Sequence, residues 1–221
     1  LPSFPTRRSS DLQVIGMTIS LLRFFPAGDQ AVRTQGTSAG LTGSEIYGKT
    51  VGIIGCGKIG FMTAKLFQAF GARVVAYARH EREEVKAAGI SYVSLEELLA
   101  ESDIISLHTP NNASTRGMIG KEQISLMNPS AVFINCARGP IVDNAALAEA
   151  LNQDKIAGAA IDVYDMEPPI PEDYPLLHAK NALLTPHVAF LTKEAMARRA
   201  EIEFANVKAY LEGKPENVCD I

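Results

Sequence analysis

A glycine-rich turn between a strand-like run and a helix-like run limits what this chain can fold into more than any other feature. The run Thr50–Ile54 is short, apolar and β-branched, which is typical of a buried strand. The next residues, Gly55-Cys56-Gly57-Lys58-Ile59-Gly60, have the spacing G-x-G-x-x-G. A helical apolar pattern covers Lys58–Phe70. This order of strand, glycines and helix predicts an α/β unit.

The glycines of this motif point to one class of ligand. Gly55 permits a tight turn, Gly57 lets the main chain approach a ligand, and Gly60 lets the helix lie close to the strand. The amino end of a helix offers N–H groups and a positive dipole end, which favour phosphate. We therefore predict a dinucleotide cofactor here; a glycine-rich turn that binds nothing is the alternative.

Strand-like and helix-like patterns alternate along the rest of the chain. The strand-like runs are continuously apolar, which predicts a parallel sheet covered on both faces, a doubly wound α/β fold of Rossmann type. For Lys58–Phe70 we expect Ile59, Met62, Leu66 and Phe70 on the buried side. The expected strands are Arg73–Tyr77, Ile104–Leu107, Ala131–Ile134, Gly158–Val163 and Ala182–Leu184; the expected helices are Gln13–Arg33, Leu95–Ala100 (capped by Ser94 and Glu97), Lys121–Leu126, Asn144–Asn152 and Leu191–Leu211.

Composition excludes several classes of protein. The chain has 221 residues, of which 47% are hydrophobic, so it can bury a core without disulfides or metal. A net charge of −4 does not suit a nucleic-acid or anionic-membrane surface. Its three cysteines lack metal-ligand spacing, so we expect no metal and a reducing, cytoplasmic location. No apolar run approaches the ~20 residues of a membrane span.

The first residues have an unusual sequence. Ser3–Leu12 reads SFPTRRSSDL, which looks like a translated sequencing-adapter oligonucleotide. We predict that residues 1–12 are non-native and pack against nothing, whereas a buried, ordered Phe4 would count against this. A native loop rich in Ser, Pro and Arg is the alternative.

The residues after the second expected strand bear on the type of cofactor. NAD-binding sheets usually place an acid there, near the ribose 2′-hydroxyl. This chain has Ala78 at that position, followed by Arg79, His80 and Arg82. A guanidinium without a competing carboxylate suits a 2′-phosphate, so we slightly favour NADP over NAD through Arg79. Alternatively, Arg79 is a solvated loop charge and the chain uses NAD.

Side chains suited to hydride-transfer chemistry follow three of the expected strands, at the edge where ligands bind to open parallel sheets. We predict that Arg138 anchors a substrate, Glu167 orients a histidine, and His187 exchanges a proton as a hydride moves. Arg138 in a structural ion pair, Glu167 as part of a proline turn and His187 as a turn histidine are the alternatives. Asp165 is a rival carboxylate. We assign His80, His108 and His178 to surface or structure.

Long segments around these residues resemble one enzyme family. INCARGPIVDNAAL, GAAIDVYDMEPP and LLTPHVAFLTKEA are similar to the D-isomer-specific 2-hydroxyacid dehydrogenases, as are GKTVGIIGCGKIG, LHTPNNASTRGMIG and VIGMTISLLRFFPAGDQAVR. The resemblance runs from Gln13 to the C-terminus. It implies an NAD(P)-dependent homodimeric enzyme that interconverts D-2-hydroxy and 2-keto acids of the phosphoglycerate, glycerate, lactate or glyoxylate type.

The resemblance also assigns roles to individual residues. It implies an active-site triad of Arg138, Glu167 and His187. The remaining cofactor contacts it implies are the main chain at Lys58 and Ile59 on the pyrophosphate, Thr109 and Pro110 beside the adenosine, Cys136 and Ala137 against the nicotinamide ribose, and Asp162 near the nicotinamide.

The chain departs from the family in two respects. One is Ala78; the other is the absence of about 100 N-terminal residues that would form most of a substrate domain. We therefore expect residues 13–190 to form the NAD(P)-binding domain and residues 191–221 a helix that returns to the missing domain, with exposed apolar side chains. Such a fragment would bind cofactor but barely turn over. The rival functions are a dinucleotide-sensing, non-enzymatic corepressor on the same scaffold and a formate-dehydrogenase-like relative, which a glutamine at position 167 would have favoured.

Overall fold

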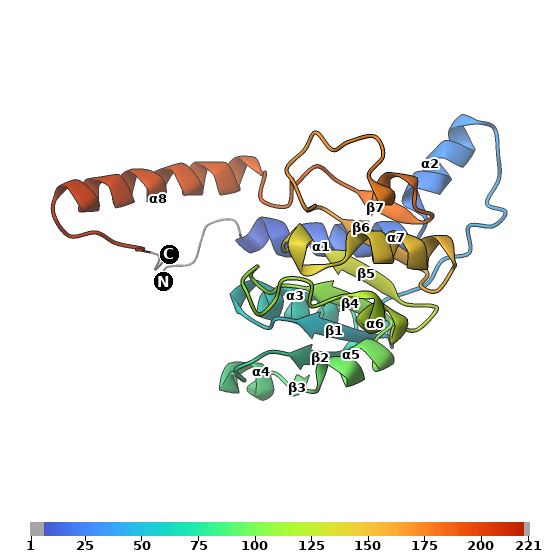
Figure 1. The fold of residues 1–221 in the computed structure, drawn as a ribbon, viewed down its shortest axis with the longest axis horizontal. Helices are drawn as coiled ribbons and strands as arrows, with labels where there is room; N and C mark the ends of the chain where they lie inside the picture. Colours follow the sequence, from blue (N-terminus) through green and yellow to red (C-terminus); the bar gives the residue numbers. More distant parts are fainter. Residues whose placement is uncertain (1–6, 219–221) are drawn as a thin grey trace.

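One parallel sheet organises the computed structural model, which describes residues 7–218 (Figure 1). Within that range seven strands lie in the order β3-β2-β1-β4-β5-β6-β7, all paired in parallel. The strand order reverses between β1 and β4, so the predicted doubly wound sheet is confirmed. The strands are β1 Thr50–Ile54, β2 Arg73–Tyr77, β3 Ser91–Tyr92, β4 Ile104–Leu107, β5 Val132–Asn135, β6 Gly158–Ile161 and β7 Ala182–Leu184.

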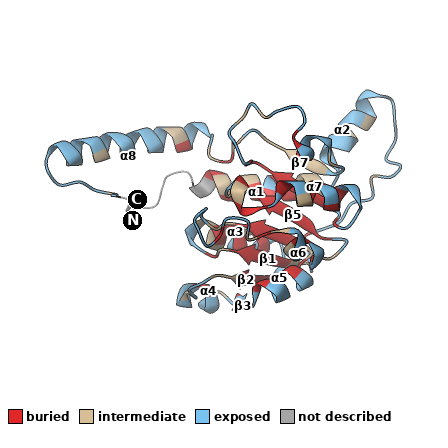
Figure 2. Ribbon diagram, in the orientation of Figure 1, coloured by how far each residue is buried: buried red, intermediate tan, exposed pale blue. Residues whose placement is uncertain are grey.

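Helices cover both faces of the sheet and produce two hydrophobic cores (Figure 2). Adjacent residues of β5 alternate between them: Phe133 packs into one core, while Val132 and Ile134 pack into the other. One core lies under α1 and α3, the other under α5, α6 and α7. The helices are α1 Arg7–Leu22, α2 Phe25–Arg33, α3 Lys58–Ala69, α4 Glu83–Ala87, α5 Leu95–Glu101, α6 Lys121–Ser125, α7 Asn144–Asn152 and α8 Lys193–Leu211, with short 3-10 helices at Gly139–Ile141 and Pro175–His178.

The first expected helix, Gln13–Arg33, is two helices. Phe24 has a φ of 52°, in the left-handed region, and separates α1 from α2. Pro26 lies in the first turn of α2, where its missing N–H costs no hydrogen bond, and it could not have continued α1. The prediction of one helix was therefore wrong because the apolar pattern outweighed a proline.

The start of α1 corrects another expectation. We expected residues 1–12 to pack against nothing, but Ser9 and Asp11 are buried in α1, and the Ser10 hydroxyl donates to the Ala189 carbonyl at 3.5 Å. For this part the expectation was wrong, because α1 extends through the segment to Arg7. Phe4 lies outside the described residues, and a non-native origin of the segment stays a prediction.

The buried face of α3 also differs from the expected one. Gly60, Thr63, Ala64 and Phe67 are buried, whereas Phe70 is 44% exposed. Ile59, Met62 and Leu66 are only half-buried. A Cβ at Gly60 would lie 2.3 Å from the Gly55 carbonyl oxygen, so the helix approaches the sheet through its small residues. We had expected the large apolar side chains to be buried. That prediction was wrong because α3 lies so close to the sheet that small residues form most of the contact.

Differences elsewhere are small. The end of β6 at Ile161 leaves Asp162 in the loop beyond the strand. The Ser94 hydroxyl accepts the Glu97 N–H at 3.1 Å, which confirms the predicted cap of α5. Neither α4 nor β3 was predicted. The two residues of β3 are too few for a periodic signal, and α4 buries only Val85.

Helix α8 extends away from the sheet (Figures 1 and 2). Of its residues only Ala195 is buried, while Phe204, Val207, Tyr210 and Leu211 are exposed. The expectation that α8 packs against a substrate domain stays a prediction. None of the helices within residues 7–218 combines the length and apolar character that crossing a bilayer requires.

Candidate functional site

The glycine turn, Gly55–Gly60, joins β1 to α3. Gly55 has a φ of 93°, and a Cβ on it would lie 2.8 Å from the Thr109 amide nitrogen. A Cβ at Gly57, in contrast, would meet no atom of residues 7–218 within 4 Å. Two of the glycines therefore satisfy close packing, and Gly57 faces open space that a ligand can use.

Near the glycine turn, some polar groups have no hydrogen-bond partner within the part of the chain that the structure describes. The first hydrogen bond of α3 runs from the Phe61 N–H to the Gly57 carbonyl at 2.8 Å, so the N–H groups of Ile59 and Gly60 have no acceptor within the helix. The Thr109 hydroxyl is buried and has no hydrogen-bond partner among the described residues. Free donors at a helix amino end fit a phosphate group, so the residues present suit a dinucleotide.

The end of β2 carries an exposed guanidinium. Arg79 donates from Nη1 to the Ser114 hydroxyl at 3.2 Å, and that hydroxyl donates to Asn112 Oδ1 at 2.7 Å. Arg82 forms an ion pair with Glu84, whereas Arg79 has no carboxylate partner among the described residues. Its charge is available to an anion, and Ser114 is a neighbour that the sequence did not reveal.

At the far side of the same sheet edge, His187 and Glu167 meet. Nδ1 of His187 lies 3.0 Å from Oε1 and 2.9 Å from Oε2 of Glu167. An ionised carboxylate only accepts hydrogen bonds, so Nδ1 carries a proton and Nε2 is the nitrogen left for proton exchange. The Phe190 ring packs edge-on against the imidazole, with centroids 5.4 Å apart. Geometry thus pairs two of the predicted residues.

The rival carboxylate, Asp165, has other partners. Its Oδ1 accepts from Asn144 Nδ2 at 3.1 Å, and its Oδ2 accepts from the Tyr174 hydroxyl at 2.8 Å. Glu167 is therefore the carboxylate that orients the histidine.

The histidine loop, Thr185–Ala189, is fixed by a buried aspartate. Asp162 is fully buried and accepts the Thr185 hydroxyl at 2.5 Å and the N–H groups of Val188 and Ala189, each at 2.9 Å. The family resemblance implies that Asp162 lies near the nicotinamide, but its contacts in the chain are to the histidine loop. Sequence reasoning missed this role because no local pattern links Asp162 to a loop so far along the chain.

Arg138 lies on the arginine loop, Cys136–Gly139, which follows β5. Its Nη1 donates to the Ala137 carbonyl at 2.6 Å, and Asn135 Nδ2 donates to the Arg138 carbonyl at 3.1 Å. Among residues 7–218 its guanidinium forms no ion pair and no hydrogen bond to Glu167 or His187. The arginine therefore lies on a neighbouring loop at the same edge, without contact to the histidine pair.

Comparison with known proteins decides the family. A family model described as "D-isomer specific 2-hydroxyacid dehydrogenase, NAD binding domain" matches residues 15–189. The chain belongs to this dehydrogenase family. A glyoxylate reductase from Korarchaeum cryptofilum (strain OPF8) is 43% identical over 182 residues, which are 81% of this chain and 54% of that protein. The chain thus spans about half the length of this relative.

Solved structures agree in fold. A D-lactate dehydrogenase from Aquifex aeolicus, complexed with NAD and lactic acid, has a TM-score of 0.90 at 32% identity, covering 97% of this chain and 69% of that one. An acyclic imino acid reductase in complex with NADPH and D-arginine has a TM-score of 0.89 at 32% identity, covering 98% and 69%. The solved structures similar to this chain therefore include one complex with NAD and one with NADPH.

The remaining predicted cofactor contacts lie near the same edge. The Cys136 thiol lies 3.7 Å from the Met17 sulfur, and burial, followed by the nearby Asp162, raises its pKa well above the usual range. That thiol stays protonated and cannot act as a base. Ala137 is half-buried, and the carbonyl of the exposed Pro110 accepts the Thr115 hydroxyl at 2.6 Å.

The other histidines have local roles. Nε2 of His108 is 2.9 Å from the Ser106 hydroxyl, and burial lowers the pKa of His108 to about 4. Nε2 of His178 is 2.6 Å from the Glu172 carbonyl. Neither contacts Glu167, and His80 is exposed. Of the four histidines, His187 is therefore the one that is hydrogen-bonded to the Glu167 carboxylate.

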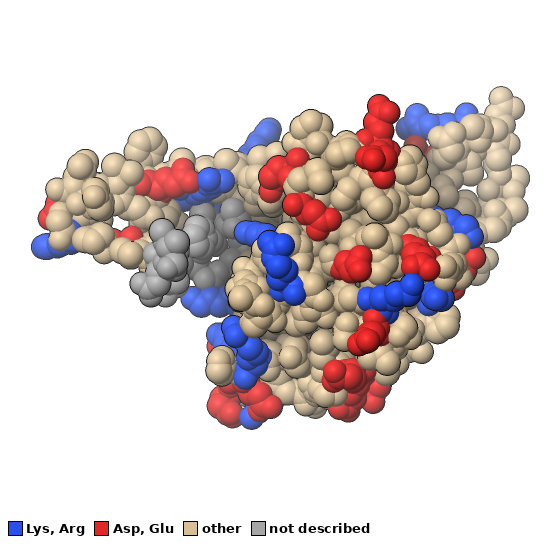
Figure 3. All heavy atoms as spheres, viewed as in Figure 1, with Lys and Arg blue, Asp and Glu red and all other residues tan. Residues whose placement is uncertain are grey.

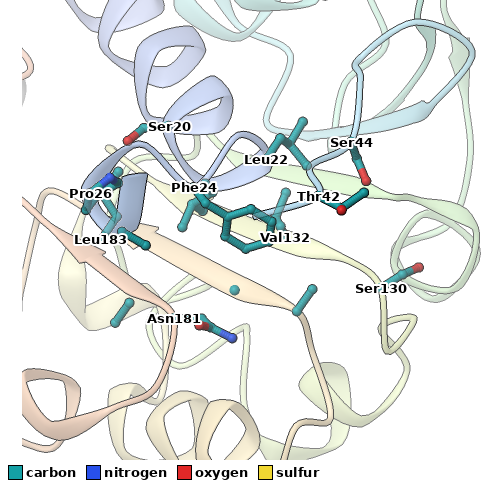
Figure 4. Close-up of a pocket in the computed structure, with 15 residues that line it drawn as sticks. Ser20, Leu22, Phe24, Pro26, Thr42, Ser44, Ser130, Val132, Asn181 and Leu183 are labelled. Carbon is teal, nitrogen blue, oxygen red and sulfur yellow. The ribbon is translucent and has the colours of Figure 1, made fainter. Parts of the chain in front are cut away.

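A cavity of about 230 Å³ lies at the opposite edge of the sheet (Figure 4). Phe24 and Pro26 line it from the joint between α1 and α2, and Val132, Gly158 and Leu183 line it from β5, β6 and β7. None of its lining residues is ionisable, so it offers no acid or base. On the face drawn in Figure 3, basic and acidic side chains are interspersed. This cavity therefore lies at the edge away from the glycine turn and the His187–Glu167 pair.

Proposed function

We propose that this chain is the cofactor-binding part of an NAD(P)-dependent oxidoreductase that interconverts D-2-hydroxy acids and 2-keto acids of the glyoxylate, glycerate, lactate or phosphoglycerate type. The observation that carries the proposal is the His187–Glu167 pair, which lies at the same sheet edge as the glycine turn. The names of the relatives, a glyoxylate reductase and a D-lactate dehydrogenase, support this substrate class.

The cofactor half of the site would hold the dinucleotide through the main chain. The N–H groups at Lys58 and Ile59 would face the pyrophosphate, with Gly57 leaving room for it. Thr109 and Pro110 would flank the adenosine. Cys136 and Ala137 would lie against the nicotinamide ribose, with Asp162 behind the histidine loop. When bound, the cofactor supplies or accepts the hydride at its nicotinamide ring.

The chain's own side chains would handle the substrate and the proton. Arg138 would hold the substrate carboxylate and the oxygen on the adjacent carbon. In the reducing direction His187 donates the proton from Nε2 to that oxygen; in the oxidising direction it removes the proton. Glu167, bonded to Nδ1, fixes the ring plane and leaves Nε2 for the substrate.

For the type of cofactor we propose a preference for NADP. Arg79 has no carboxylate partner among the described residues, and Ala78 takes the place of the usual ribose-binding acid. The nearby Ser114 hydroxyl adds a second hydrogen-bonding group for a 2′-phosphate. Dissociation constants for NADPH and NADH, measured by fluorescence, test this preference; tighter binding of NADH would contradict it.

We further propose that the protein forms a homodimer in the cytoplasm. Exposed apolar side chains on α2, Phe25 and Val32, support an association surface, and the unpaired thiols of Cys56 and Cys136 support a reducing compartment. Light scattering of the purified chain tests the homodimer, and a monomer at micromolar concentration would contradict it.

The experiment that tests the proposed activity uses cofactor and substrate separately. Because the chain spans 54% of the glyoxylate reductase it matches, NADPH binding is the direct test of this chain, and turnover by the chain alone is expected to be very low. The complete protein should oxidise NADPH when glyoxylate or hydroxypyruvate is added. Binding of NADPH without turnover by the complete protein would instead indicate a dinucleotide-sensing module.

A further inference from the structure

We propose that Tyr164 is a positioning residue that fixes the histidine loop and the arginine loop of the site relative to each other. The inference rests on the proposed function for its catalytic meaning, but its geometry is independent of it. Tyr164 follows β6 and is 7% exposed. Its hydroxyl lies 3.0 Å from the Thr185 carbonyl and 3.3 Å from the Ile161 carbonyl. A phenol has one proton to donate, and the shorter contact directs it to Thr185.

The Thr185 carbonyl is the point at which Tyr164 acts on the histidine. That carbonyl also accepts the N–H of His187 at 3.0 Å. His187 has a φ of 56°, a left-handed conformation that is uncommon for a residue other than glycine. Such a conformation persists when the surrounding structure over-determines it. Before His187, the Tyr164 hydroxyl binds the Thr185 carbonyl. After it, the Asp162 carboxylate binds the N–H groups of the next two residues.

The main chain of Tyr164 also supports the arginine loop. A Cβ on Gly139 would lie 1.9 Å from the Tyr164 carbonyl oxygen, so the two loops touch through their backbones next to Arg138. Glu167 is on the same loop as Tyr164, three residues further on. Tyr164 therefore contacts the loop that carries Arg138 and the loop that carries His187, and it belongs to the loop that carries Glu167.

Tyr174 provides a matched control. Its ring packs edge-on against that of Tyr164, with centroids 5.9 Å apart, and both rings lie in the same core. Its hydroxyl also has a hydrogen-bond partner, but that partner is the exposed Asp165, which lies outside the histidine loop. Tyr164→Phe and Tyr174→Phe each remove one hydrogen-bonded hydroxyl from the same core. Only Tyr164→Phe removes a hydrogen bond to the histidine loop.

The test compares these two variants of the 221-residue chain by NMR. The signals measured are the Nδ1 proton of His187 and amide hydrogen exchange at Val188 and Ala189. We expect Tyr164→Phe to broaden the Nδ1 signal and to accelerate exchange at both amides about five- to tenfold, the equivalent of one neutral hydrogen bond. Tyr174→Phe should leave both readouts unchanged.

Loss of general stability would not produce this difference, because it would affect both variants and the Ser106–His108 contact as well. Equal effects of the two variants, or unchanged signals in Tyr164→Phe, would overturn the proposal. NADPH binding by the unmodified chain is measured separately. Failure to bind would overturn the proposed function, whereas the NMR comparison would still decide whether Tyr164 positions His187.

Discussion

The two halves of the site are built in opposite ways. Around the histidine loop, hydrogen bonds are already made: Asp162 accepts three of them, and Glu167 holds the imidazole. Around the glycine turn, space and donors remain: nothing occupies the Cβ position of Gly57, and the Thr109 hydroxyl has no partner among the described residues. The proposed catalytic half, around the histidine loop, is therefore preorganised by the protein, whereas the proposed cofactor half, around the glycine turn, leaves room for a ligand.

The largest expected effect is the loss of stability in Gly139→Ala, in the catalytic half. The added Cβ would lie 1.9 Å from the Tyr164 carbonyl oxygen, so one of the two loops must move. We expect the free energy of unfolding to fall by about 3 kcal/mol, the upper part of the usual range for overpacking. Urea denaturation measures this; a variant as stable as the unmodified chain would show that the loops are not in backbone contact.

A second prediction concerns pH and the histidine under the glycine turn. The pKa of His108 is lowered to about 4, so the unfolded chain binds a proton first as the pH falls below about 6.5. The free energy of unfolding should therefore decrease as the pH falls from 6.5 to 4. Below pH 4, His108 should cause no further change. The contribution is about 3 kcal/mol at most.

Urea midpoints measured across this pH range check the prediction. His108→Gln keeps a polar partner for the Ser106 hydroxyl but removes the titrating group, so its profile should be flatter. An unchanged slope in the variant would assign the pH dependence to other groups.

The sharpest contrast with Gly139→Ala is Gly57→Ala, in the cofactor half. A Cβ there would meet no atom of the described residues within 4 Å, and Gly57 has a φ of −73°, which alanine adopts readily. We expect the free energy of unfolding to be unchanged. NADPH binding should weaken about tenfold to a hundredfold, because the methyl group would occupy the space in which the ligand binds. Unimpaired NADPH binding would show that the ligand does not use this space.

The smallest expected effect is on cofactor preference. Arg79→Ala should weaken NADPH binding about tenfold, the equivalent of one charge-assisted hydrogen bond, and leave NADH binding nearly unchanged. Arg82→Ala is the control, because Arg82 is already paired with Glu84. Equal losses for NADPH and NADH would remove Arg79 from the recognition of the 2′-phosphate.

The sequence predicted the parts of this structure that depend on local patterns. The strand Thr50–Ile54 and the helix Asn144–Asn152 have the expected bounds, because apolar runs and caps are read over a few residues. The burial of α3 was mispredicted, since close packing of Gly60 on Gly55 is a tertiary effect. In the site, Glu167 and His187 could be named from their segments.

The supports of those residues could not be named in the same way. Tyr164 and Thr185 are 21 positions apart, and their hydrogen bond exists only once β6 and β7 lie side by side. The same holds for Arg79 and Ser114, which are 35 positions apart. Residues with chemistry of their own can be recognised in a sequence, whereas residues that act through another residue's main chain leave no pattern.

The most direct measurement is a titration of the isotope-labelled chain with NADPH, followed by NMR. If the glycine turn and the histidine loop form one nicotinamide site, the amides of Gly57 and Ile59 and the ring of His187 should shift together with a single dissociation constant. Signals from Asn181, in the cavity at the opposite edge, should stay unchanged. Shifts at the glycine turn with none at His187, or shifts confined to that cavity, would contradict this account.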